Sequence, residues 1–176
     1  MRITGGLYKG RRIACPPGII RPAMDRMRES LFAILRNLDQ KSFLDLYSGS
    51  GIVGIEAASR GAEPVYLIEK DVKKRKTIIN NISFIDSHIR LFLKSCENFL
   101  KKTHEHFDII YCDPPFNRKN KGEILELIDN NMILHKDGIV IIHAPREDTF
   151  SNSYGNLILY DRRKYGRSIL YFYHNQ

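Results

Sequence analysis

Four consecutive residues, Asp113-Pro114-Pro115-Phe116, follow the apolar segment 107–112 and combine groups suited to chemistry on an amino nitrogen. The exocyclic amino group of a nucleobase is a poor nucleophile because its lone pair is delocalised into the ring. A carboxylate and a carbonyl held by prolines can each accept one N–H, which localises the lone pair and stabilises positive charge as it forms. Phe116 can stack on a base taken out of its helix. The alternative is a turn that Asp113 merely caps.

A second candidate site is the pattern of strand, glycine turn and helix over residues 43–59. The turn, Tyr47-Ser48-Gly49-Ser50-Gly51, follows a short apolar run, and its glycines let a ligand approach the backbone closely. Asp45 precedes the turn. Glu69 ends the next apolar run, about 20 residues after the turn, where a carboxylate can accept both hydroxyls of a ribose. We therefore expect the turn and Glu69 to bind a cofactor that contains a nucleoside.

The spacing of Gly49, Gly51 and Gly54 also matches the dinucleotide fingerprint, so a nicotinamide oxidoreductase is an alternative. Tyr160 and Lys164 even have the Tyr-x-x-x-Lys spacing, but they lie beside a late strand candidate, and we interpret the spacing as chance. S-adenosylmethionine has no pyrophosphate and benefits from an acid just before the turn. Asp45, together with the Asp-Pro-Pro motif, favours methyl transfer over hydride transfer.

The 176 residues, 43% hydrophobic and 27% charged, suit a single globular domain, residues 1–176. Within it, residues 1–22 form a basic N-terminal extension and residues 23–176 the catalytic core. No apolar stretch approaches 18 residues and no secretory signal is recognisable, so a cytoplasmic protein without a membrane span is expected.

Cysteine and histidine usage argues against metal sites and disulfides. The three cysteines, Cys15, Cys96 and Cys112, are odd in number and have no Cys-x-x-Cys spacing. Cys112 could be a nucleophile for methylation of a ring carbon, but it closes an apolar strand, where a small buried thiol is the usual outcome. The pair His104 and His106 has no third ligand nearby in sequence, which favours a solvated turn and no metal.

The formal charge of +8 is concentrated at the two ends of the chain. Residues 1–36 hold eight Lys or Arg against two acids, a balance of +6, and residues 160–176 hold four against one, a balance of +3. Such clustering is the expected footprint of contacts to a phosphate backbone. The alternative is that the charge serves solubility only. The loop 117–121 is also basic, and we expect it to be mobile and to close over a nucleotide, or else to be a plain solvated loop.

The hydrophobic pattern predicts a glycine-turned hairpin over residues 2–13 and a helix along Met27 to Leu38 with Asp25 as its cap. Strands are predicted at 43–47, 65–69, 89–93, 107–112 and 139–143, with helices around 71–84, 95–103 and 121–131. This alternation indicates a parallel sheet covered on both faces. The final runs, 157–160 and 169–173, are too close for a helical crossover and predict an antiparallel pair. The result is a seven-stranded, mostly parallel α/β sheet with an antiparallel last strand.

Several motifs together resemble one family across nearly the whole chain, the bacterial 16S rRNA (guanine-N(2))-methyltransferases of the RsmD type. They are Arg2-Ile-x-Gly-Gly with Lys9-Gly-Arg11, Arg21-Pro-x-x-Asp25-Arg-x-Arg-Glu-x-Leu-Phe32, Asp45-Leu-Tyr-Ser-Gly-Ser-Gly51, Leu67-Ile-Glu69 and Asp113-Pro-Pro-Phe116. The resemblance implies a Rossmann-like class I fold and methyl transfer from S-adenosylmethionine to the 2-amino group of a guanine in 16S rRNA. It implies small ribosomal subunits or their assembly intermediates as partner. Nothing requires more than a monomer.

The resemblance also distributes roles over residues. Asp113, Pro114, Pro115 and Phe116 are expected to be catalytic, and the expected cofactor contacts are Asp45, Tyr47, Ser48, Gly49, Gly51, Glu69, Ser95 and Cys96. The expected RNA contacts are Arg2, Lys9, Arg11, Arg12, Arg21, Arg26, Arg28, Arg118 and Lys119.

The chain departs from the family pattern at two places. Ala23-Met24 stands where a Thr followed by Thr or Ser is expected, and Ser95-Cys96 where an Asp or Asn followed by Ala meets the adenine amino group. Ser95 has a shorter reach toward that group. Two alternatives stay open: an enzyme that methylates amino groups of adenine or cytosine in DNA, and a nucleic-acid-binding module with an inactive pocket.

Overall fold

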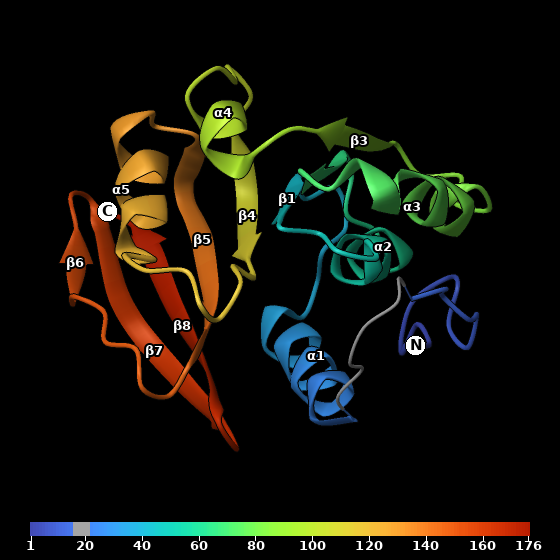
Figure 1. The fold of residues 1–176 in the computed structure, drawn as a ribbon, viewed down its shortest axis with the longest axis horizontal. Helices are drawn as coiled ribbons and strands as arrows, with labels where there is room; N and C mark the ends of the chain where they lie inside the picture. The colour runs from blue at the N-terminus through green and yellow to red at the C-terminus, as the bar shows by residue number, and fades with distance from the viewer. Residues whose placement is uncertain (16–21) are drawn as a thin grey trace.

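The computed structural model describes residues 1–15 and 22–176, with the backbone alone for 22–24 (Figure 1). The predictions for Arg21 and for the side chains of Ala23 and Met24 lie outside the described residues. Within them, no helix is long and apolar enough to cross a membrane.

One sheet of eight strands runs through the molecule in the order β3-β2-β1-β4-β5-β8-β7-β6. β1 to β5 are parallel neighbours in that order, and β8 lies antiparallel to both β5 and β7. The bounds are β1 Phe43–Leu46, β2 Val65–Glu69, β3 Ile89–Leu93, β4 Phe107–Cys112, β5 Leu134–Pro145, β6 Ser153–Tyr154, β7 Leu157–Tyr165 and β8 Ser168–Asn175. The predicted fold class is confirmed, whereas the predicted count of seven strands is wrong for the described chain. The two-residue β6 is too short to produce a hydrophobic pattern.

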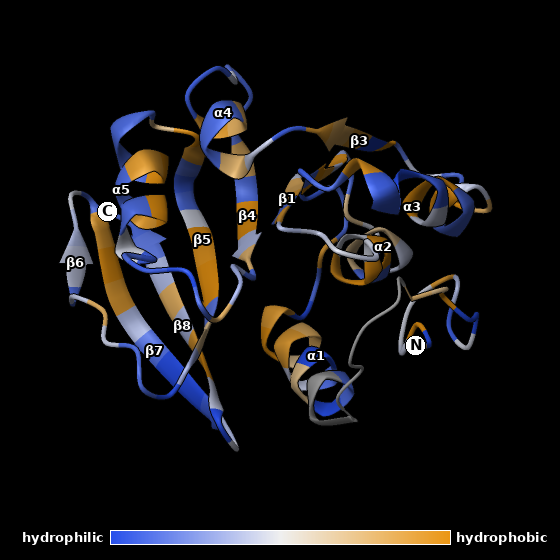
Figure 2. Ribbon diagram, in the orientation of Figure 1, coloured by the Kyte–Doolittle hydropathy of each residue, from blue (hydrophilic) through white to orange (hydrophobic). Residues whose placement is uncertain are grey.

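Helices cover both faces of this sheet, and the alternation of side chains along the strands decides which residues meet which helices. The helices are α1 Pro22–Leu35, α2 Ile52–Ser59, the 3₁₀ turn η1 Val72–Lys74, α3 Arg75–Ile82, α4 Cys96–Leu100 and α5 Gly122–Asn130. Leu44 and Leu46 belong to the apolar cluster that includes α4 and α5. Phe43 belongs to the cluster on the opposite face, with α1, α2 and α3. Figure 2 shows the hydrophobic strand segments between these layers.

The N-terminal segment packs against α2 but forms less of a hairpin than its sequence predicts. Its only isolated bridge joins Arg2 and Arg12 in antiparallel fashion, and no strand is assigned within residues 1–15. Ile3, Tyr8 and Ile13 are buried in a small cluster with two isoleucines of α2. The extension is therefore attached to the core by an apolar contact.

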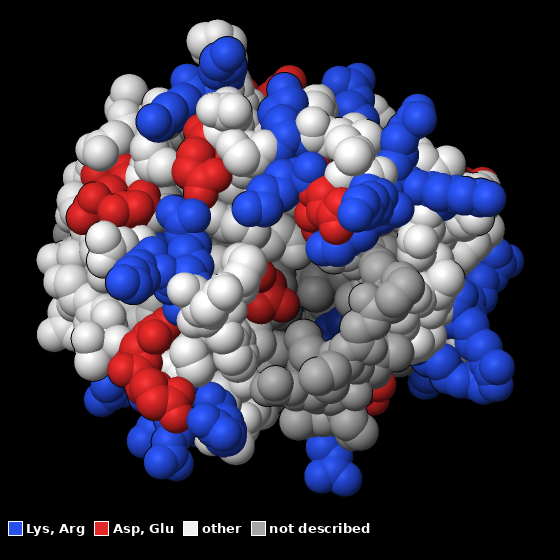
Figure 3. Space-filling model, viewed as in Figure 1, with Lys and Arg blue, Asp and Glu red and all other residues white. Residues whose placement is uncertain are grey.

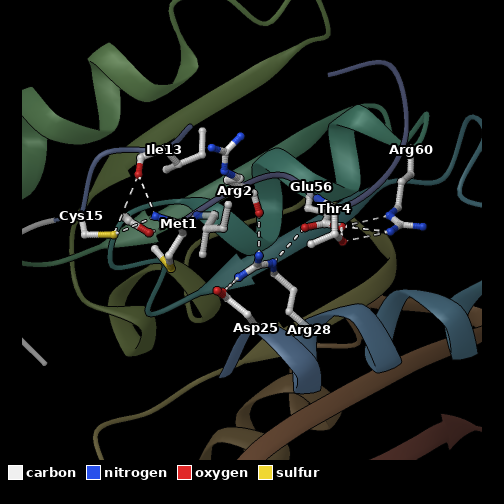
Figure 4. A network of polar contacts seen from close by, with 11 residues as sticks. Met1, Arg2, Thr4, Ile13, Cys15, Asp25, Arg28, Glu56 and Arg60 are labelled. Carbon is white, nitrogen blue, oxygen red and sulfur yellow. Dashed lines mark hydrogen bonds and ion pairs between the residues drawn. The ribbon is translucent and has the colours of Figure 1, made fainter. Parts of the chain in front are cut away.

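A buried ion pair joins α1 to α2 and involves two residues for which the sequence predicted other roles (Figure 4). Arg28 is 4% exposed, and its Nε donates to Oε2 of Glu56 at 2.8 Å. Asp25 does not cap the helix. It lies in the first turn of α1, and its Oδ1 accepts from Nη1 of Arg28 at 2.8 Å. RNA contact by Arg28 stays a prediction that this arrangement does not favour, because its guanidinium is buried and already bound by these acids and by the carbonyl of Arg2.

Candidate active site

The carboxyl ends of β1, β2 and β4 meet at one edge of the sheet, which is where open α/β sheets bind their ligands. A pocket of about 510 Å³ lies there. It is lined by Tyr47, Glu69, Lys70, Asp71, Lys74, Asp113, Pro114, Pro115, Phe116, His143 and Ser168. The two candidate sites of the sequence, the Asp-Pro-Pro-Phe motif and the carboxylate that ends β2, therefore share one cavity.

The glycine turn between β1 and α2 is built from residues in left-handed backbone conformation. Gly49 has φ of 61° and Gly51, the first residue before α2, has φ of 80°. Tyr47 has φ of 63°, which is uncommon for a residue with a side chain and indicates a constrained loop. The hydroxyl of Ser48 donates to the carbonyl of Asp45 at 2.7 Å, which holds the start of the turn.

The side chain of Glu69 lines the pocket and binds the backbone of this turn. Its Oε2 accepts the N–H of Gly49 at 2.9 Å and its Oε1 accepts the N–H of Asp71 at 2.9 Å. Nζ of Lys74 lies 3.1 Å from Oε2. Oε2 thus accepts from both Gly49 and Lys74, whereas Oε1 accepts only from Asp71 and can still accept a hydroxyl group of a bound nucleoside. The arrangement fits the predicted role of Glu69 at a ribose.

Asp45 lies beneath the turn and is 1% exposed, and it is not a lining residue of the pocket. Its Oδ2 accepts the N–H of Gly54 at 3.0 Å, which links β1 to the first turn of α2. Burial raises the pKa of Asp45 to about 8, assisted by the charges of Asp113 and Glu69 and opposed by the Gly54 hydrogen bond. Asp45 thus supports the turn from below, and direct contact with a cofactor stays a prediction.

Ser95 and Cys96 lie at the start of α4, and neither lines the pocket. Oγ of Ser95 accepts the N–H of Asn98 at 3.2 Å as the helix cap, which leaves its own hydrogen for another partner. Burial raises the pKa of the Cys96 thiol to about 12. Their contact with adenine stays a prediction.

Cys112 is fully buried, and burial raises the pKa of its thiol well above the ordinary value, which fits the expected inert thiol.

The Asp-Pro-Pro-Phe motif begins directly after β4. The N–H of Asp113 donates to the carbonyl of Leu46 at 3.3 Å, which aligns the motif with the end of β1. Pro114 is buried, whereas Phe116 is 38% exposed and lines the cavity.

His143, at the end of β5, was given no role by the sequence. Its Nδ1 lies 2.7 Å from Oδ1 of Asp113, and its ring meets Phe116 edge-on with the ring centroids 5.2 Å apart. The available signal was its position: His143 ends the run 139–143, as Asp113 follows the run 107–112 in the neighbouring parallel strand.

The loop 117–121 is anchored at Lys121 and Arg118, while Asn117, Lys119 and Asn120 are exposed as its composition predicts; its mobility stays a prediction. Lys121 is buried, and its Nζ donates to the carbonyls of Phe116 and Arg118, at 2.9 Å each, and lies 2.6 Å from Oδ2 of Asp148. The guanidinium of Arg118 pairs with Glu97 at 2.6 Å. The interpretation as a plain solvated loop is therefore wrong for Lys121. The side chains of Lys121 and Arg118 therefore bind groups that hold the loop in place.

The comparison with known proteins agrees with this geometry. The family model described as "Conserved hypothetical protein 95" matches residues 1–174. The chain belongs to this family. The Bacillus subtilis "Putative rRNA methyltransferase YlbH" is 31% identical over 173 residues, 94% of each chain. "Ribosomal RNA small subunit methyltransferase D" of Escherichia coli is 32% identical over 152 residues, 84% of this chain and 76% of the relative.

A solved structure, "Putative methyltransferase yhhF from Escherichia coli", has a TM-score of 0.90 and 29% identity, covering 100% of this chain and 98% of the other. The family predicted from the motifs and its methyltransferase fold are confirmed, and methyl transfer is the reaction class of the family. No group of three or more His, Cys, Asp or Glu that could hold a metal occurs among residues 1–15 and 25–176.

A hydroxyl contact joins helix α1 to the β7–β8 hairpin. The hydroxyl of Tyr165, near the tip of the β7–β8 hairpin, is 2.5 Å from the hydroxyl of Ser30 on α1. Arg162, Arg163, Lys164 and Arg167 are exposed around this tip. Ser168 follows them and lines the pocket. Arg167 therefore directly precedes a residue of the cavity wall.

The remaining predicted RNA contacts are surface residues. Arg2, Lys9, Arg11, Arg12, Arg26 and Lys119 are exposed. The guanidinium carbon of Arg11 lies 4.7 Å from the ring centroid of Phe84, which holds this cation at the surface. Figure 3 shows Lys and Arg side chains spread around the visible face, with smaller acidic groups between them. RNA contact by these residues stays a prediction.

Proposed function

We propose that this protein transfers a methyl group from S-adenosylmethionine to the exocyclic 2-amino group of a guanine in the RNA of the small ribosomal subunit. The observation that carries the proposal is the single cavity that Glu69 and Asp113 share with Pro114 and Phe116. One carboxylate suits the hydroxyls of a nucleoside cofactor, and the other suits an amino group. The relatives named for methylation of small-subunit rRNA support the choice of RNA.

The residues of the chain would divide the work as follows. The glycine turn and Glu69 hold the methyl donor, which supplies an electrophilic methyl group on a positively charged sulfur. Asp113 and the carbonyl of Pro114 accept the two amino hydrogens of the guanine, and Phe116 stacks on the extruded base. These contacts localise the nitrogen lone pair toward the methyl carbon, so the rate arises from alignment and electrostatic stabilisation, without a covalent enzyme intermediate.

The extrusion of the base costs a few kcal/mol, and contacts to the phosphate backbone offset this cost. We infer that exposed cations of the hairpin and of the pocket wall make such contacts. Arg162, Arg163 and Arg167 stand at the hairpin tip, and Lys70 lies in the wall of the cavity next to Glu69. The binding of RNA is expected to weaken steeply as the salt concentration rises.

The decisive experiment supplies methyl-labelled S-adenosylmethionine and, in parallel reactions, small ribosomal subunits, naked rRNA and duplex DNA. Digestion to nucleosides then identifies the labelled base. N2-methylguanosine from subunits or rRNA is the expected product. Labelled adenine or cytosine from DNA would instead identify a DNA enzyme. A protein that binds RNA but yields no labelled product and no melting shift with S-adenosylmethionine would have an inactive pocket.

Two variants test the assignment of the motif. Asp113→Ala removes the acceptor for the amino hydrogen, and we expect its turnover to fall by at least about 100-fold, as when a single oxyanion-hole donor is lost. Its melting shift with S-adenosylmethionine should be almost unchanged. Phe116→Leu keeps an apolar side chain and removes the stacking face, so it should raise the KM for RNA more than that for the cofactor. Wild-type turnover by Asp113→Ala would refute the mechanism.

A further inference from the structure

The strand register brings His143 to the side of Asp113. β4 and β5 are parallel, and Cys112, the last residue of β4, is paired with Ile142, so the residues that follow them, Asp113 and His143, lie side by side. Nδ1 of His143 is 2.7 Å from Oδ1 of Asp113, within the range of a charge-assisted hydrogen bond. This contact is made by the carboxylate that the proposed function assigns to the amino group.

Both partners line the cavity, but they differ in solvent exposure. The side chain of His143 is 2% exposed, whereas that of Asp113 is 26% exposed and faces the pocket. The ring of His143 also packs edge-on against Phe116. His143 therefore contacts both functional side chains of the motif while being closed off from solvent itself.

The hydrogen-bonding pattern fixes which nitrogen of His143 carries a proton. A carboxylate oxygen only accepts hydrogen bonds, so Nδ1 must carry the hydrogen that points at Asp113. Nε2 is buried and has no hydrogen-bond partner among the described residues. A bare nitrogen is less costly in such a place than an N–H without an acceptor, because the latter would forfeit a strong donor bond to water. Both observations select the tautomer with hydrogen on Nδ1.

We propose that His143 is a positioning residue of the reaction. It holds Oδ1 of Asp113, so that Oδ2 is presented to the amino group of the substrate, and it supports the orientation of the Phe116 ring. This inference rests on the proposed function for the role of Asp113. The contact itself, and the tautomer it requires, stand independently of which base is methylated.

A matched pair of variants separates positioning from mere packing. His143→Asn can place an amide N–H near the position of Nδ1, while His143→Leu has similar bulk and no donor. We expect kcat of His143→Leu to fall by about 10- to 100-fold, the range expected when a hydrogen bond to a charged group is lost. His143→Asn should retain kcat within about threefold. The dissociation constant for S-adenosylmethionine and the melting temperature should change little in either variant, since a purely structural defect would alter both.

Wild-type kcat in His143→Leu, or an equal loss of kcat in both variants, would overturn the proposal. If His143→Leu does not fold, nuclear magnetic resonance of isotope-labelled histidine in the wild-type protein still decides. The expected spectrum shows hydrogen on Nδ1 of His143, with a shift of that signal in Asp113→Ala. Hydrogen on Nε2 alone would overturn the inference. An inactive wild-type enzyme with hydrogen on Nδ1 would count against the proposed function but not against the pair.

Discussion

The ion pair between Arg28 and Glu56 offers a sharp test of how the N-terminal part is attached to the core. Glu56 is fully buried and lies 2.8 Å from Nε of Arg28. The same carboxylate accepts the N–H of Thr4 at 3.2 Å and Nη2 of Arg60 at 2.9 Å. Glu56→Gln keeps the volume and removes the charge, so two guanidinium groups would face a neutral amide.

The expected loss is large. Removal of one member of a buried ion pair destabilises a protein by about 3–5 kcal/mol, because the other charge stays buried. Two features place Glu56→Gln at the lower end, about 3 kcal/mol. Asp25 remains 2.8 Å from Arg28, and Arg60 is 24% exposed, so water screens part of its charge. The melting temperature should fall by roughly 6–12 °C in a domain of this size.

Urea unfolding at neutral pH, followed by circular dichroism, measures this loss. Arg60→Gln is the matched control: it removes the more exposed partner of the same carboxylate and should cost only about 1 kcal/mol. The double variant Arg28→Met with Glu56→Met should recover part of the lost stability, because neither charge is then left buried. A loss below about 1 kcal/mol for Glu56→Gln, with an unchanged urea slope, would refute the reasoning.

Three further changes test other parts of the structure. The pKa of Asp45 is about 8 in the folded protein and about 4 in the unfolded chain. Its protonated carboxyl therefore stabilises the folded state at acidic pH, and this contribution is lost as the pH rises from about 4 to 8. The urea midpoint of Asp45→Asn should therefore rise relative to that of the wild type between pH 5 and pH 8, and identical pH profiles of the two proteins would contradict this. Lys121→Met should release the loop from the carbonyls that Lys121 binds, so that kcat falls about tenfold at an unchanged cofactor affinity measured by calorimetry. Arg162→Glu with Arg163→Glu should weaken RNA binding and flatten its dependence on salt in filter-binding titrations, and an unaltered slope would exclude phosphate contacts there.

Sequence patterns predicted the site residues whose positions follow from the local order of strands and turns along the chain. Asp113 and Glu69 each end or follow a short apolar run, and parallel strands bring such ends to one edge of the sheet. The same rule would have suggested His143, but its partner is known only once β4 and β5 are paired in register. The turn residues were found because glycines at fixed spacing mark a backbone that must adopt positive φ.

Burial of charge was not predictable from local pattern. Arg28 stands in a basic segment and resembles its exposed neighbours in sequence, while its partner, Glu56, lies in the short apolar helix α2. Lys121 likewise lies in a polar loop, and its acidic partner, Asp148, is 27 residues away in sequence. A long-range partner decides in each case whether a cation is a surface group or part of the core.

The start of β5 was missed for a related reason. The strand begins at Leu134, yet the following three residues are polar and Asp137 has φ of 63°, which is typical of a turn. The pairing of Leu134 with Phe107, across a register shift before Ile109, keeps this segment in the sheet. Hydrogen bonding to a neighbouring strand outweighs the local sequence here, as it commonly does in sheets.

The three acids at this edge of the sheet have unequal support, and that inequality separates their roles. Glu69 is held by Lys74 and by two backbone N–H groups, and Asp113 by His143, so each faces the pocket with a partner on its protein side. Among the described residues, Asp45 accepts one backbone N–H and pairs with no cation, and burial raises its pKa to about 8. Because it readily keeps its proton, the buried carboxyl of Asp45 is suited to a structural role in the glycine turn. The partnered acids can keep one face fixed while the other accepts hydrogen bonds from ligands, which is the property that orientation of a donor and an amino group requires.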